Sequence, residues 1–362
     1  MSSWLKSASL AAAAILALPA AAQAQHYTQT NLVSDLANQG AVTVDPNLKN
    51  PWGLARGAAS PWWVNSEGTG TSRLYNGQGQ IVAALPFVTV PTPSGSGVST
   101  PTGIVSNGSQ DFDLVAGNTA TASVFIFATK DGTIAGWNPA VKPTTAVIKV
   151  NESARKAVFT GLTWAVIDGQ HFLFAANFHS GAVEIFDASF TKAGDFAFSP
   201  FPGFAPYNVQ AVGANIVVTY AEQNSTKTAT VDGTGKGFAV VYDLRGRIVS
   251  VLQNGPWFNA PWGVELAPQD FGTFSHALLI ANRGSGTIAA FNATSGQYLG
   301  TMLDASGNPL AIPGLWGIEV GNGGTAGSPL NLYFAAGING YADGLFGTIT
   351  PVAAELNVED HE

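Results

Sequence analysis

The 362 residues of the chain include no cysteine. This absence excludes structural disulfides, thiolate metal sites, a thiol nucleophile and a lipid-modified cysteine. The stability of the folded chain therefore has to come from the burial of a large apolar core.

Charge is also scarce, at 10% of the residues, and its balance is acidic, with 15 Lys and Arg against 23 Asp and Glu. Proteins that bind nucleic acid or anionic membranes need clustered basic residues, so neither partner is expected. The low charge is accompanied by 42 glycines and 20 prolines. Such a composition is typical of an all-β protein with short strands and many turns.

Long apolar runs are missing except at the N-terminus. There Lys6 precedes an apolar run from Ala8 to Leu18, and Ala22-Gln23-Ala24 matches a signal peptidase site. The run is shorter than the roughly 20 residues of a membrane-spanning helix. Residues 1–24 are therefore predicted to be a cleaved signal peptide. We expect an exported, periplasmic or extracellular protein that is monomeric and does not insert into the membrane after cleavage.

The common catalytic motifs are missing as well. The chain has no G-x-S-x-G and no H-E-x-x-H, and its five histidines form no i, i+4 pair. GTGKG at 233–237 lacks the spacing of a phosphate-binding loop and is predicted to be a flexible hairpin tip. DASGNP at 304–309 has too few acidic ligands for a calcium loop. No cofactor is predicted from these patterns.

A repeated phrase is what the sequence does contain. It reads NPWGLARG at 50, TPTGIVSNG at 100, FTGLTWAV at 159, APYNVQAVG at 205, APWGVELAP at 260 and GLWGIEVGNG at 314. The glycine, or Asn208 in its place, recurs at intervals of 50, 58, 47, 55 and 54 residues. Six units of this period predict a propeller. Proline suits a strand start that has no free backbone donor, and glycine lets the innermost strand approach the crowded axis.

Further apolar runs in each unit predict four short antiparallel strands, which is the content of one propeller blade. The prediction is an all-β, six-bladed β-propeller over residues 25–352, with blades starting near 50, 100, 158, 205, 260 and 314. The sixth unit ends near Pro351 without a fourth strand, and the alternating segment 26–36 is predicted to complete that blade and close the ring. Residues 353–362 are predicted to form an acidic tail, and 221–237, in the fourth unit, a long surface loop.

The pattern P-x-G-hydrophobic, followed by an apolar strand that ends in Asn, resembles the NHL-type propeller repeat. DPNLKNPWGLA at 45 and WWVNSEGTGTSRLYN at 62 are similar to an uncharacterised family of secreted bacterial propeller proteins, some of which carry a C-terminal protein-sorting tail. The resemblance implies a propeller fold and export, and no established reaction. This chain ends in VEDHE, without a hydrophobic C-terminal anchor.

Candidate binding residues follow from the geometry of a propeller. The turns between second and third strands emerge on the same face as the starts of the inner strands, around the central channel. The residues predicted there are Asn65, Glu67, Lys130, Asp131, Asn177, His179, Glu222, Asn224, Asn282, Arg283 and Asn339, with the aromatic residues Trp52, Tyr207, Trp262 and Trp316 beside them.

Two interpretations of these residues are open. Asn65, Asn177 and Asn282 occupy equivalent places in the repeat, which favours turn capping, and the tryptophans can serve blade packing. The acidic and basic residues break the repeat, as expected of binding residues. Such a ring could hold Ca²⁺ or another divalent cation through oxygen ligands, or stack a flat ligand.

Two functions are compatible with this pattern. The favoured one is a secreted binding or scaffold protein that engages a small molecule, a glycan or a protein through one face of the channel. The alternative is a divalent-metal-dependent hydrolase or lyase of the gluconolactonase-like type. It would use Glu67 or Glu222 as a metal ligand and His179 as general base.

Overall fold

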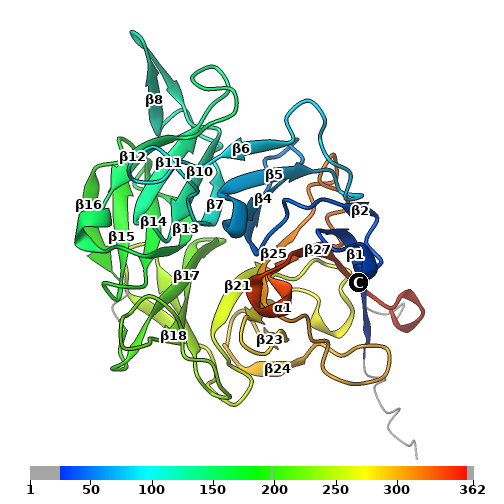
Figure 1. Ribbon diagram of the computed structural model, residues 1–362. Coiled ribbons are helices and arrows are strands. Elements are labelled where there is room, and N and C mark those ends of the chain that lie inside the picture. The colour runs from blue at the N-terminus through cyan, green and yellow to red at the C-terminus, as the bar shows by residue number, and fades with distance from the viewer. Residues whose placement is uncertain (1–24, 197–198, 357–362) are drawn as a thin grey trace, which may run out of the picture.

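The computed structural model describes residues 25–196 and 199–356, and the predicted signal peptide lies outside them. Six blades of four antiparallel strands surround a common axis, so the prediction of an all-β, six-bladed propeller is confirmed (Figure 1). In the described part of the chain, no helix is both long and apolar enough to cross a bilayer.

Each blade runs from an inner strand at the axis to an outer strand at the rim. Blade 1 contains β3 (Pro51–Ala55), β4 (Trp62–Ser66), β5 (Thr71–Tyr75) and β6 (Phe87–Thr89), blade 2 contains β7 (Pro101–Ser106), β10 (Phe125–Thr129), β11 (Thr133–Trp137) and β12 (Val147–Asn151), and blade 3 contains β13 (Phe159–Ile167), β14 (Gln170–Asn177), β15 (Ala182–Asp187) and β16 (Lys192–Phe196). Blade 4 contains β17 (Phe204–Val212), β18 (Asn215–Glu222), β19 (Phe238–Asp243) and β20 (Ile248–Val251), blade 5 contains β21 (Pro261–Leu266), β22 (Leu278–Asn282), β23 (Ile288–Phe291) and β24 (Tyr298–Thr301), and blade 6 contains β25 (Leu315–Val320), β26 (Leu332–Ala336), β27 (Leu345–Pro351) and β1 (Tyr27–Ser34).

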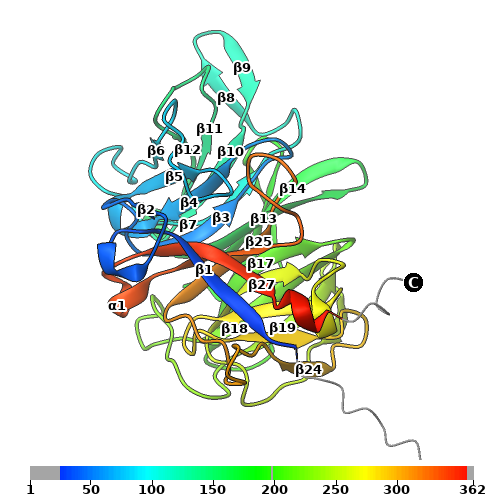
Figure 2. The same ribbon diagram turned by 90° about the vertical axis from the view of Figure 1, so that its right-hand side faces the viewer.

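The N-terminal strand closes the ring, as predicted. β1 pairs antiparallel with β27, from Tyr27 opposite Pro351 to Ser34 opposite Leu345, and Figure 2 shows the two strands side by side. The start of the predicted tail takes part in this closure, because Glu355 accepts hydrogen bonds from the backbone N–H of His26 (2.7 Å) and lies 2.9 Å from its Nδ1. Residues 357–362 lie outside the described residues.

The repeated glycine lies where the inner strands of neighbouring blades make close contact, as its place in the phrase predicts. A Cβ on Gly53 would lie 2.4 Å from the carbonyl oxygen of Thr102, and one on Gly103 would lie 2.6 Å from the backbone nitrogen of Leu162. Inner strands of neighbouring blades therefore touch through their backbones at Gly53 and Gly103, and a side chain at either position would push them apart.

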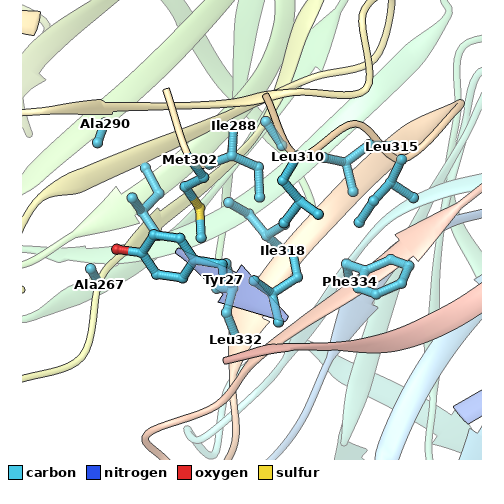
Figure 3. Packing of buried hydrophobic residues seen from close by; sticks show 14 of the residues in the cluster. Tyr27, Ala267, Ile288, Ala290, Met302, Leu310, Leu315, Ile318, Leu332 and Phe334 are labelled. Atoms are coloured by element: carbon cyan, nitrogen blue, oxygen red, sulfur yellow. The ribbon is translucent and has the colours of Figure 1, made fainter. Parts of the chain in front are cut away.

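The core lies between the blades, where the inward faces of neighbouring sheets meet. At the closing seam Tyr27 is 1% exposed and packs near Met302, Leu310 and Ile318 (Figure 3). Its hydroxyl donates a 2.9 Å hydrogen bond to the carbonyl oxygen of Phe271. β1 is therefore held in place by the burial of the Tyr27 side chain as well as by its backbone hydrogen bonds to β27.

Two small elements lie outside the predicted pattern. β8 (Asp113–Ala116) and β9 (Thr119–Ala122) form a hairpin that projects from blade 2 (Figures 1 and 2). β2 (Thr43–Val44) adds a fifth, parallel strand beside β1. A two-residue strand has no detectable period, and the hairpin interrupts the repeat, so neither follows from the phrase.

Candidate functional site

We call the face where the inner strands begin the front face. Pro51 of β3 lies opposite Ser66 at the end of β4, and Pro261 of β21 lies opposite Asn282 at the end of β22. The starts of inner strands and the turns after second strands therefore share this face, as predicted from the sequence.

Aromatic side chains close the channel just below the front face. Trp52 and Trp316 stack with ring centroids 3.7 Å apart, and Trp262 meets both rings edge-on at 6.1 to 6.3 Å. Tyr207 lies 6.0 Å from Trp316. All four side chains are at least 95% buried. The tryptophans of the repeated phrase thus build a floor across the axis, and their ring faces are largely covered by one another.

A cavity of about 420 Å³ lies above this floor, and we call it the front pocket. It is lined by Asn50, Trp52, Glu67, Lys130, Thr160, Tyr207, Thr228, Ala229, Thr230, Asp232, Arg283, Trp316 and Tyr341. Its volume is in the range of small-molecule sites.

A chain of polar contacts crosses one wall of the front pocket. Lys130 Nζ lies 2.8 Å from Glu67 Oε1, and Asn50 Nδ2 donates to Glu67 Oε2 at 3.0 Å. Asn50 Oδ1 in turn accepts a 3.1 Å hydrogen bond from Trp316 Nε1. Lys130 Nζ also lies 5.5 Å from the centroid of the Trp52 ring, a cation–π distance. The floor and this wall therefore hold each other in place.

Arg283 forms the opposite wall. Its side chain is 7% exposed and donates to the hydroxyl of Tyr341, the hydroxyl of Thr230 and the carboxylate of Asp232. The guanidinium lies over the rings of Trp316 (5.5 Å) and Tyr341 (5.2 Å). Burial opposes the charge, but Tyr207, Tyr341 and Asp232 outweigh it and raise the pKa of Arg283. The residue is therefore a fixed cation.

The long loop of blade 4 provides the roof of the front pocket. Residues 228–230 and Asp232 line the cavity, and Gly233 N donates to Asn259 Oδ1 at 2.7 Å. Gly235 N donates to the carbonyl oxygen of Phe258 at 2.8 Å. The GTGKG segment, predicted to be a flexible tip, is instead hydrogen-bonded to the connector before blade 5. The predicted surface loop therefore packs against the connector before blade 5 and lines the front pocket.

A second cavity of about 520 Å³ adjoins the first, and we call it the side pocket. Asp131 and His179 line it, together with Lys130, Ser153, Lys156, Ala157, Val158, Thr226 and Thr228. Lys130 and Thr228 belong to both cavities, so the two pockets meet at these residues.

The structure therefore divides the predicted charged site. Glu67 and Arg283 lie in the front pocket, while Asp131 and His179 lie in the side pocket. Glu222 lines neither cavity and pairs with Lys236 at 3.3 Å. The two proposed metal ligands, Glu67 and Glu222, hold separate lysines. Among the described residues, no three His, Asp or Glu side chains are grouped to hold a metal ion.

The three asparagines are buried and hydrogen-bonded to other parts of the fold. Asn65 is fully buried and donates to the carbonyl oxygen of Thr102 in the next blade at 2.9 Å. Asn177 accepts from Val158 N and Ser180 N and donates to Glu184, and Asn282 accepts from Asn259 N. Asn177 and Asn282 thus accept from a backbone N–H just before the inner strand of their own blade, and Asn177 also caps its own turn at Ser180. Asn65 differs, because it links two blades and its Oδ1 has no hydrogen-bond partner among the described residues.

Several residues of the front pocket were not among the predicted site residues. Asn50 directly precedes a strand start, and a search for polar residues there could have found it, whereas Lys130 and Tyr207 were predicted at this face. Tyr341 comes from α1 (Ile338–Tyr341), and Thr230 and Asp232 come from the loop. Neither segment has a counterpart in the other units, so the repeat carries no signal for them.

At the opposite, back face, two glutamates follow the repeated phrase at the same position of β21 and β25. Burial raises the pKa of Glu265 to about 7, against a hydrogen bond from the backbone of Leu266 and the charge of Arg56. Burial and the charge of Glu265 raise the pKa of Glu319, which Arg56 partly offsets. Arg56 Nε lies 3.8 Å from Glu319 Oε1 and donates to the carbonyl oxygen of Val320. These carboxyls form a coupled pair remote from the front pocket.

Comparison with known proteins supports the fold and places the chain among relatives. No protein-family model matches the chain. Among solved structures, it resembles a streptogramin B lyase (TM-score 0.50, 12% identity, 91% of this chain and 98% of the other). It also resembles a Bacteroides thetaiotaomicron protein of unknown function (TM-score 0.51, 12% identity, 90% and 76%). At such identities these similarities concern the fold alone.

Sequence relatives occur in a giant virus, Acanthamoeba polyphaga mimivirus. Uncharacterized protein L690 is 27% identical over 89% of this chain and 85% of its own length. Uncharacterized protein R648 is 31% identical over 88% of this chain and 78% of its own length. The chain therefore belongs to the same protein family as the mimivirus protein R648.

Proposed function

We propose that this protein is an exported binding protein that captures a small polar molecule in the front pocket. Export is supported by the N-terminal signal pattern. Binding is supported by one observation above all. The polar groups of the pocket are already fixed by each other over a closed aromatic floor, before any ligand arrives.

Such pre-organisation favours affinity because little side-chain entropy is lost on binding. Glu67 is held by both Asn50 and Lys130, and Arg283 is held by Tyr341, Thr230 and Asp232. Each cation faces a carboxylate, so the pocket offers donors and acceptors close together without a net charge. A polar molecule with several hydrogen-bonding groups fits this pattern.

The roof supports the same proposal. Only the fourth unit carries the long loop, and its Thr230 and Asp232 bind Arg283 of the next blade. A loop needed only to join β18 and β19 could be a short hairpin turn. Its length instead turns an open channel mouth into a walled pocket.

The test is to identify small molecules that leave the protein when it is denatured after mild purification. Mass spectrometry of the released material should show one compound at near-equimolar yield from the native protein. Glu67→Gln and Asp232→Asn should lose it at least about tenfold, equivalent to about 1.4 kcal/mol. Asp168→Asn is the matched control, because Asp168 pairs with Arg245 outside both pockets. Equal yields from all variants would contradict binding in the front pocket.

A further inference from the structure

The short segment that contributes Tyr341 to the front pocket has an unusual backbone. Within α1, Asn339 (φ 53°, ψ 47°) and Gly340 (φ 66°, ψ 33°) are left-handed, and Tyr341 follows at φ 73°. Glycine adopts this conformation freely and asparagine tolerates it, whereas the Cβ of a tyrosine comes too close to the following carbonyl oxygen. The segment is therefore strained at the residue whose side chain lines the cavity.

The two ends of this segment are anchored more firmly than its middle. Gly337 N donates to the carbonyl oxygen of Gly314 at 2.9 Å, and Asp343 pairs with Lys49 at 3.0 Å. Residues 339–342 between these anchors are exposed. The backbone hydrogen bonds that span the turn are long, at 3.2 and 3.4 Å. An exposed turn with weak internal hydrogen bonds has low local stability, so its position depends on side-chain contacts.

The side chain of Tyr341 supplies such a contact. Its hydroxyl accepts a hydrogen bond from Arg283, and its ring centroid lies 5.2 Å from the guanidinium and 5.9 Å from the ring of Trp316. On its other side, Arg283 donates to Thr230 and Asp232 of the blade 4 loop. Arg283 thus binds two segments that each occur once in the chain, the loop and the strained turn. Backbone strain favours release of Tyr341, and the contact with Arg283 opposes it.

We propose that residues 339–341 form a gate of the front pocket, closed by Tyr341 on Arg283, and that its opening sets how fast a small molecule enters and leaves. This inference rests on the proposed function and adds the regulation of the same site. The cavity of about 420 Å³ exists with Tyr341 in place, so a small molecule has room behind the closed gate. Opening loses the contact with Arg283 and relieves the backbone strain. Because these two effects oppose each other, single substitutions should shift the balance.

Hydrogen–deuterium exchange of the dialysed protein, followed by mass spectrometry, measures the opening. Gly340→Ala changes the backbone preference alone, because a Cβ at Gly340 would meet no atom within 4 Å. Alanine disfavours the left-handed conformation of the closed gate, so the amides of 339–343 should exchange about fivefold faster. Tyr341→Phe keeps the ring but removes the acceptor for Arg283, and it should act in the same direction. Gly169→Ala is the matched control, because Gly169 has φ 81°, equally open surroundings and a place outside both pockets.

The link between the gate and the pocket needs a second measurement, the loss of the compound that the native protein releases on denaturation. Samples are dialysed for increasing times, denatured and assayed for the amount that remains. Gly340→Ala and Tyr341→Phe should lose the compound faster than the native protein and Gly169→Ala. Because Gly340 does not line the front pocket, faster loss from Gly340→Ala reports the gate and not a missing ligand contact. Its yield before dialysis should stay near equimolar.

The outcomes separate this inference from the proposed function. Equal exchange of residues 339–343 in all four proteins overturns the gate and leaves the binding function intact. Faster exchange combined with equal loss of the compound means that the turn moves without controlling the pocket, which also overturns the gate. A native protein that releases no compound contradicts the proposed function, and the gate falls with it.

Discussion

The charged residues at the two ends of the channel differ in how they are paired. At the front face every charge of the pocket stands opposite a partner, as for Glu67 with Lys130. At the back face Glu265 and Glu319 share one arginine, Arg56. Two carboxyls that compete for one cation in a half-buried site cannot both ionise without loss of stability.

The back-face glutamates should make stability fall as the pH rises. The folded-state pKa of Glu265, about 7, lies above its ordinary value, and the pKa of Glu319 is raised as well. The folded protein therefore retains protons that the unfolded chain releases, and stability is lost between about pH 4.5 and the folded-state pKa values. The double variant Glu265→Gln, Glu319→Gln should lack this loss.

Urea unfolding at pH 5.5 and pH 8 measures the effect. The variant should gain on the order of 2 kcal/mol over the native chain when the pH is raised from about 5.5 to about 8. A parallel change in both proteins would assign the pH dependence to other groups. Asp168→Asn serves as the control, because Asp168 pairs with Arg245 and does not affect the pKa of either glutamate.

At the scale of elements, the seam between β1 and β27 joins the two ends of the chain. Its ladder runs from Tyr27 to Ser34, and the side chain of Lys49 pairs with both Asp35 and Asp343 beside it. The backbone hydrogen bonds of the ladder, the buried side chain of Tyr27 and the ion pairs of Lys49 therefore all stabilise this seam. The ring depends on this seam, because without β1 the edge of β27 is open.

Deletion of residues 25–36 should cost several kcal/mol, a large share of the 5 to 15 kcal/mol typical of a domain. The loss includes the β1 ladder and the burial of Tyr27. Thermal melting and size-exclusion chromatography should show a lower melting temperature and association through the open edge. Deletion of 357–362 is the control and should change neither. A truncated protein that melts within a few degrees of the full chain and stays monomeric would contradict the closure model.

The sequence predicted those elements whose physical cause repeats. A glycine that meets the backbone of the next blade recurs in five of the six units, as at Gly53 and Gly103, and the missing fourth strand of unit six implied the closure by β1. The β8–β9 hairpin, α1 and the fold-back of the blade 4 loop occur once each. An element that occurs once leaves no period, so its place could not be predicted.

The candidate site was predictable only in part for the same reason. Breaks in the repeat led to Glu67 and Arg283, which line the front pocket, and to His179, which lines the side pocket. The repeat could not tell that Arg283 would be bound by Asp232 of a folded-back loop. The partition into two cavities depends on such long-range contacts, which spacing along the chain does not encode.

At the scale of the whole molecule, we expect export to remove residues 1–24. Intact-mass measurement of protein recovered from the medium or the periplasm should give a chain that begins at Gln25. Gln25 is the first residue that the structure describes, and its buried side chain donates to the carbonyl oxygen of His26 at 2.9 Å. A recovered mass that still includes Met1 would contradict cleavage.

The aromatic floor gives the molecule an optical property. Trp52 and Trp316 are close enough, at 3.7 Å, for their excited states to couple, and Trp262 stands within 6.3 Å of both. Lys130 and Arg283 lie over the rings of the stacked pair. A ligand that draws either cation away from its indole changes the electric field on coupled chromophores. The near-ultraviolet circular dichroism and the tryptophan emission of the unlabelled protein should therefore report whether the front pocket is occupied.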